Sequence, residues 1–228
     1  QPLGTNDFIV SCSFGDHSNH SSTTHAESVL YSQEEKISMI AGGGTQYRVY
    51  PLPAESPNHG PEVLIADPSG IGEGSPFGWH DVNGIAGEEY TITRGNNVYA
   101  YEDVNDVNSP GYSPNGGTSL NFNFPINLNQ SPANYQDVAI TNLFFTCNRI
   151  HDILYLYGFD EQSGNFQENN YGNGGAASDN IRAEAQDGGG TNNANFATPP
   201  DGSNPTMQMY LWAANGGAAN LLTVNSPS

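Results

Sequence analysis

The stretch DVAITNLFFTCNRIHDILYLY, residues 137–157, carries the strongest structural signal in the chain. Its apolar side chains recur every three or four residues, at Ile140, Leu143, Phe144, Cys147, Ile150, Leu154 and Tyr157. This period places them on one face of a helix. Gly158 can end that helix because glycine adopts the left-handed backbone conformation without strain. We therefore predict a long central helix over about residues 136–157.

Before this helix, the chain consists of short apolar or alternating segments that are typical of β-strands. Residues 89–93 and 98–102 flank the turn sequence Gly95-Asn96-Asn97, and this pattern predicts a β-hairpin. Further strands are expected at residues 47–50, 63–65 and 120–124.

After the helix, residues 181–186 are a candidate strand. The stretch GGGTNNANFATPPDGSNPTMQMYLW follows at residues 188–212. It indicates a glycine loop, a short extended piece, a turn at residues 199–202 and a strand at residues 207–212. The sequence therefore predicts an α+β fold that is rich in short strands and hairpins and contains one long helix.

The charge balance of the chain limits its partners. Five Lys and Arg residues face 24 Asp and Glu residues among 228, a formal net charge of -19. Binding to phosphates needs clustered basic residues, so a nucleic-acid partner and an anionic membrane surface are not expected. No run of 18 apolar residues is present, and hence no membrane-spanning segment is expected. The acidic residues are scattered and predict a solvated acidic surface.

The N-terminal part has a different character from the rest. Residues 1–25 are polar, residues 26–40 carry a weak helical pattern, and residues 41–44 form a boundary that is rich in glycine. The chain begins with Gln1 and shows no signal segment, so we expect a processed piece of a longer protein. His17, His20 and His25 could bind a metal, but a solvated polar arm is the favoured interpretation, because no Cys, Asp or Glu partner has a fixed spacing.

Residues able to perform chemistry are few. The chain has no H-E-x-x-H, C-x-x-C, G-x-S-x-G or phosphate-loop motif. His151 lies beside Asp152 and could be a general base, but we interpret His151 and His80 as structural histidines. Cys147 is expected to be a buried thiol, and a disulfide with Cys12 is the alternative.

Two short segments leave a functional and a plain structural interpretation open. Residues 102–106, Glu-Asp-Val-Asn-Asp, offer oxygen ligands for calcium, but a solvated acidic loop is favoured because the spacing of an EF-hand is absent. Asn193, Ala194 and Asn195 could form a sheet edge that pairs with an extended peptide. From the residues alone, an ordinary surface loop is favoured there.

Longer motifs favour the functional interpretation of residues 193–195 over a surface loop. TRGNNVYAYED, ITNLFFTCNRIHDILYLYGFDEQSGNFQENNYGNGG and AEAQDGGGTNNANFATPPDGSNPTMQMYLW strongly resemble the fungalysin family of secreted zinc metalloendopeptidases. YRVYPLPAESPNHGPEVLIADPSGIGEGSPFGWHD resembles the start of their catalytic region. The likeness covers residues 46–212 and implies the β-rich N-terminal lobe of a thermolysin-like metallopeptidase, with a mixed sheet and an edge strand.

The resemblance also implies a function and a division of the chain. Asn193 and Ala194 would hold a protein or peptide substrate, and Asn192, Asn195 and Phe196 would flank them. Residues 1–45 would be a pro-region remnant or flexible linker, and residues 46–228 the N-terminal lobe, cut before the zinc-binding helix.

The zinc ligands and the general base would lie outside this chain, in a C-terminal lobe of the same secreted, extracellular parent protein. No catalytic or metal-binding residue can therefore be named in this chain, and the chain alone is expected to be inactive. Calcium is a further candidate cofactor. The alternative function is a non-catalytic, secreted peptide-binding or adhesion module.

Overall fold

The computed structural model describes residues 45–54, 57, 59–66, 68, 73–214 and 217–220. Several predictions fall on residues outside these ranges: the His17, His20 and His25 arm, Cys12, the weak helical pattern at residues 26–40 and the glycine boundary. Within the described residues, no helix is long and apolar enough to cross a membrane.

A small sheet contains three of the predicted strands. Strand β1 (Gln46–Val49) lies in its centre, β2 (Val63–Ala66) pairs with it antiparallel, and β4 (Asn121–Phe122) pairs with it in parallel. The alternating pattern at residues 120–124 thus yields a strand of only two residues. Its inward side chain, Phe122, is fully buried and stacks on Tyr47 of β1, with ring centroids 5.2 Å apart.

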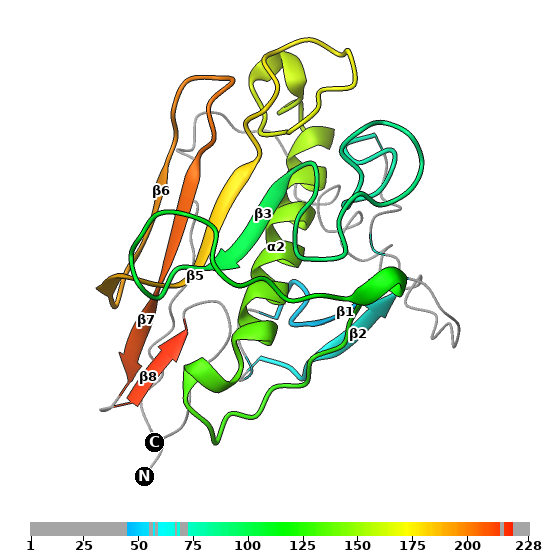
Figure 1. Ribbon diagram of the computed structural model, residues 1–228. Helices are drawn as coiled ribbons and strands as arrows, with labels where there is room; N and C mark the ends of the chain where they lie inside the picture. Colours follow the sequence, from blue (N-terminus) through cyan, green and yellow to red (C-terminus); the bar gives the residue numbers. More distant parts are fainter. Residues whose placement is uncertain are drawn as a thin grey trace, which may run out of the picture. The chain divides into compact units, whose positions relative to one another are not determined.

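A larger mixed sheet joins one strand that precedes the long helix to the strands that follow it (Figure 1). Its strands follow the order β3 (Val98–Glu102), β5 (Ile181–Thr191), β7 (Thr206–Ala214) and β6 (Ala194–Ala197). The first three run parallel, and β6 pairs antiparallel with β7. A further strand, β8 (Gly217–Asn220), pairs with the C-terminal part of β7.

Two predictions about this sheet are wrong. Gly188, Gly189 and Gly190 were expected in a loop, yet they continue β5, which stays paired with β7 through two register shifts as far as Thr191. Such bulges accommodate extra residues without ending a strand. Residues 89–93 form no strand, and the expected hairpin is reduced to one bridge, Arg94 to Tyr99, and a few backbone bonds such as Ala100 N to the carbonyl of Thr93 at 2.8 Å. Its second arm, β3, instead pairs in parallel with β5.

The predicted central helix is confirmed as α2 (Gln136–Leu156). Gly158, with φ +89°, ends it as expected. The N–H of Gly158 donates to the carbonyl of Tyr155, and the N–H of Phe159 donates to the carbonyl of Leu154. Both bonds satisfy carbonyls that the last turn leaves free. Short 3₁₀ helices lie at Gly117–Ser119, Pro132–Asn134 and Glu161–Ser163.

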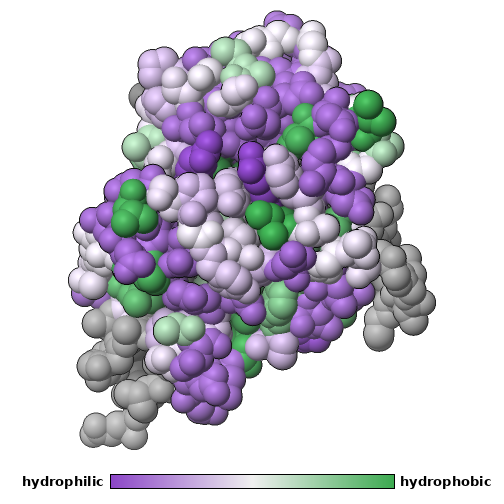
Figure 2. All heavy atoms as spheres, viewed as in Figure 1, coloured by the Kyte–Doolittle hydropathy of each residue, from purple (hydrophilic) through white to green (hydrophobic). Residues whose placement is uncertain are grey.

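Helix α2 packs against β1, β3 and β5, so both sheets share one apolar core with it (Figure 1). Cys147 on this helix is a free, buried thiol, as expected, and its Sγ lies 3.9 Å from the sulfur of Met207 on β7. The face seen in Figure 2 is largely hydrophilic, with apolar side chains in small scattered groups. Polar side chains therefore cover most of the core on this face.

Candidate functional site

The site begins at β6, the last strand in the order of the larger sheet. Asn195 lies opposite Gln208 of β7, and Tyr210 N donates to the carbonyl of Asn193 at 3.3 Å. In an antiparallel pair, backbone groups alternate between the partner strand and the opposite side. The backbones of Asn193 and Asn195 therefore face β7, and those of Ala194 and Phe196 face away from it.

The five residues expected to hold a substrate lie together on this strand and on the turn before it. Asn192 adopts a left-handed conformation, with φ +56°, where the chain reverses from β5. Asn193 is exposed, and its side chain makes no hydrogen bond within the described part of the chain. Ala194 is half-buried against the core, and Phe196, 40% exposed, contacts the ring of Phe166, with centroids 5.8 Å apart.

Asn195 differs from its neighbours because its side chain is already bound. Its Nδ2 donates to Oε1 of Gln208 at 2.9 Å and to the hydroxyl of Tyr210 at 2.7 Å. Gln208 in turn donates from Nε2 to Oδ2 of Asp187 at 2.9 Å. This row of hydrogen bonds, the Asn195–Gln208–Asp187 ladder, crosses β7 and connects β6 to β5.

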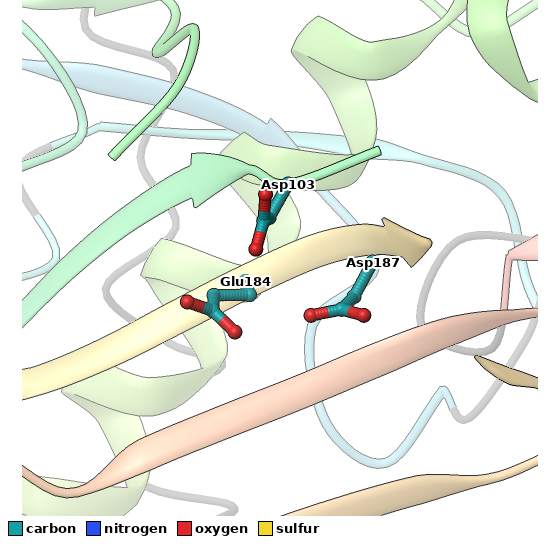
Figure 3. A group of neighbouring side chains, drawn as sticks. All are labelled: Asp103, Glu184 and Asp187. Atoms are coloured by element: carbon teal, nitrogen blue, oxygen red, sulfur yellow. The ribbon is translucent and has the colours of Figure 1, made fainter. Parts of the chain in front are cut away.

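The ladder ends at three carboxylates that come from distant parts of the chain (Figure 3). Asp103 directly follows β3, while Glu184 and Asp187 lie on β5; their exposed fractions are 2%, 1% and 1%. One oxygen from each lies within 4.8 Å of the others. We call Asp103, Glu184 and Asp187 the acidic cluster.

The acidic cluster corrects one prediction and adds two residues that the sequence analysis missed. The solvated loop expected at residues 102–106 is wrong for Asp103, because parallel pairing of β3 with β5 buries its carboxylate. Glu184 and Asp187 left a signal in the sequence. Glu184 stands between two alanines of a buried strand, and three glycines follow Asp187.

Backbone and side-chain donors hold the cluster in place. Asp103 accepts the N–H groups of Val107 at 2.9 Å and Asn108 at 2.8 Å, one on each oxygen. Asp187 accepts Gly189 N at 2.6 Å. The hydroxyl of Tyr101 donates to Oε1 of Glu184 at 3.0 Å.

Burial and the nearby charge of Asp187 raise the pKa of Glu184 to about 7. The carboxyl group of Glu184 is therefore far easier to protonate than an exposed glutamate.

These residues do not fit a catalytic zinc ion. Zinc sites are built mainly from histidine and cysteine, but the one group of three potential ligands among the described residues consists of carboxylates only. His80 and His151 are buried, as expected for structural histidines. His80 contacts the hydroxyl of Tyr47 and the carbonyl of Arg94, and His151 contacts Asp152 at 3.2 Å.

Sequence comparison relates these features to a known class of enzymes. Extracellular metalloproteinase 2 of Trichophyton tonsurans is 46% identical over 169 residues, which are 73% of this chain and 26% of that protein. Extracellular metalloproteinase MEP of Fusarium vanettenii is 45% identical over 170 residues, with the same coverage of each chain. A model of the fungalysin metallopeptidase (M36) family matches residues 46–221.

The chain therefore belongs to the fungalysin metallopeptidase family, as its motifs predict. It spans about a quarter of the length of the curated relatives that it matches.

Proposed function

We propose that this chain is the substrate-binding part of a secreted zinc metalloendopeptidase, which hydrolyses internal peptide bonds of proteins. Two relatives are named extracellular metalloproteinases, which supports both the activity and the secretion of the parent protein. The zinc ligands and the general base would belong to a C-terminal lobe of that parent. No bond-breaking step is assigned to residues of this chain.

One observation carries the proposal: β6 presents an open edge. The N–H and C=O groups of Ala194 and Phe196 face away from β7, and no other described strand pairs with them, so they can pair with an extended peptide. A peptide added to a sheet edge in this way gains backbone hydrogen bonds whatever its sequence. This mode suits an endopeptidase that must hold many different substrates.

The two asparagines of the strand have different roles in this proposal. The side chain of Asn193 is exposed and can bind a carbonyl or N–H group of the substrate. Asn195 is a positioning residue, because its amide nitrogen is held by Gln208 and Tyr210. The half-buried Ala194 leaves room for the peptide to approach the backbone.

The test is Asn193→Ala in the full-length protein. An oriented hydrogen bond is worth about 1–3 kcal/mol, so we expect kcat/KM for peptides to fall roughly 5- to 150-fold. Zinc content and Tm should stay at the values of the unmodified enzyme. Asn129→Ala is the matched control, since Asn129 is an exposed asparagine in the loop before α2.

An unchanged kcat/KM in Asn193→Ala would remove this residue from the substrate site. A full-length protein that binds extended peptides but cleaves none would favour the peptide-binding or adhesion module instead.

A further inference from the structure

We propose that Asp103, Glu184 and Asp187 bind a calcium ion, which ties the end of β3 to the bulged part of β5. This proposal does not depend on the peptidase function, because none of the three residues has a role in substrate binding or hydrolysis in the proposed function. It rests on the charge, the geometry and the donor chemistry of the acidic cluster.

No basic side chain among the described residues balances the charge of the cluster. Buried carboxylates are costly unless they are paired. Within the part of the chain that the structure describes, no Lys, Arg or His forms an ion pair with any of the three. Moreover, Oε2 of Glu184 is fully buried and has no hydrogen-bond partner among these residues. A buried oxygen without a partner requires an explanation, and a bound cation is one that also balances the charge.

The geometry fits a single ion. Calcium lies about 2.4 Å from its oxygen ligands, so two ligands of one ion are at most about 4.8 Å apart. One oxygen from each of the three side chains meets this limit. Figure 3 shows the three carboxylates gathered in one region, two from β5 and one from the residue that follows β3.

The donor set selects calcium among common metal ions. Three carboxylates offer only oxygen, which hard cations prefer and which suits zinc poorly. Magnesium requires near-ideal octahedral geometry and keeps much of its water, whereas calcium accepts irregular sets of six to eight oxygens. The fixed backbone bonds of Asp103 and Asp187 hold their carboxylates in place before an ion arrives.

Two glycines allow the chain to close around the cluster. A Cβ at Gly188 would lie 2.3 Å from the carbonyl oxygen of Val104. A Cβ at Gly189 would lie 2.8 Å from Oδ1 of Asp106 and 2.9 Å from Oδ1 of Asp187. Side chains at these positions would push β5 away from the loop that carries Asp103. The backbone carbonyls of this loop are further oxygens from which calcium could complete its coordination.

A shared proton is the competing explanation. Two carboxyl groups in contact can hold one proton between them, and burial already raises the pKa of Glu184 to about 7. The two explanations differ in their prediction for added metal. Calcium binds the proposed site and displaces the proton, whereas a cluster that only shares a proton does not respond to calcium.

The experiment uses the 228-residue chain after treatment with a chelator. Titration with CaCl₂ should show one bound ion per chain by calorimetry. At about a hundredfold excess over Kd, the Tm should rise by roughly 5 to 10 °C. MgCl₂ at the same concentration should produce a smaller shift.

Three variants locate the ion. Glu184→Gln keeps an acceptor for Tyr101 but removes the charge, and Asp187→Asn keeps an acceptor for Gly189. Each should weaken calcium binding at least about tenfold, as expected for loss of a charged ligand. Asp179→Asn should bind calcium like the unmodified chain. Asp179 is a fully buried carboxylate outside the cluster that accepts the N–H groups of Gln167 and Gly202.

Two results would overturn the proposal. If the unmodified chain shows neither heat nor a Tm shift with CaCl₂, the cluster shares a proton and binds no ion. If calcium binds equally well to the Glu184→Gln and Asp187→Asn variants, the ion occupies another part of the acidic surface. The titration of the unmodified chain decides the first point even if a variant fails to fold.

Discussion

The buried histidine His80 should make the fold sensitive to acid. Its Nδ1 lies 3.0 Å from the carbonyl of Arg94, which can only accept, so Nδ1 carries the proton of the neutral ring. Nε2, 2.6 Å from the hydroxyl of Tyr47, must then accept from it. The ring also stacks between Phe122 and Phe144. A second proton on Nε2 would force Tyr47 to accept instead of donate and would place a positive charge inside an apolar cluster.

The size of the effect follows from the pKa of His80. Burial lowers it from an ordinary value of 6.5 to about 4, against an opposing effect of nearby carbonyls. Below pH 6.5 the unfolded chain takes up a proton that the folded chain refuses. The stability contributed by the neutral ring is therefore complete above pH 6.5 and is lost as the pH falls through 4. At 1.36 kcal/mol for each pKa unit, the loss is about 3 kcal/mol.

The assay is urea denaturation at pH 7, 6, 5 and 4 for the unmodified chain and for His80→Gln. Glutamine can donate to Arg94 and accept from Tyr47 but does not titrate. Between pH 7 and pH 4 the unmodified chain should therefore lose about 3 kcal/mol more unfolding free energy than His80→Gln. His59→Gln is the control, because His59 is exposed. Parallel pH curves for the unmodified chain and His80→Gln would refute this reasoning.

Two further predictions concern buried positions. Gly95→Ala should abolish folding, because its Cβ would lie 1.6 Å from the carbonyl oxygen of Trp79. Gly60→Ala is the control and should change the Tm little, because its Cβ meets only ordinary contacts. A circular dichroism spectrum of a folded Gly95→Ala chain would contradict the expectation. Burial raises the pKa of the Cys147 thiol to about 12. In a Cys12→Ala variant, iodoacetamide should therefore label Cys147 only in denaturant. Rapid labelling of the native variant at pH 8 would count against the buried position.

Local patterns predicted the elements that depend on neighbours in sequence. Helix α2 follows from a sustained period and a glycine stop, and β7 follows from alternation of Met207, Met209 and Leu211. The glycines of β5 misled the prediction, because glycine is a turn signal unless a partner strand holds it extended. Here Thr191, beyond the glycines, still pairs with Leu211 of β7.

The acidic cluster depends on contacts that no local pattern contains. Asp103 and Glu184 are far apart in sequence, and they meet because Glu102 lies opposite Ala185 in a parallel pair. Parallel pairing requires a crossover, and α2 lies in the connection that supplies it. The resemblance to fungalysins is the basis for proposing β6 as a substrate strand, an interpretation that spacing alone did not favour. It did not point to the acidic cluster, which lies on the far side of β7 from β6 in the same sheet.

The Asn195–Gln208–Asp187 ladder has a direction. Each amide donates toward Asp187, because a carboxylate can only accept. Gln208 therefore turns its oxygen toward β6, and Asn195 donates to that oxygen from its nitrogen. The oxygen of Asn195 takes no part in the ladder and is the acceptor that this exposed residue retains. A buried negative charge on β5 thus decides whether the surface of β6 offers an acceptor or a donor to whatever lies against it.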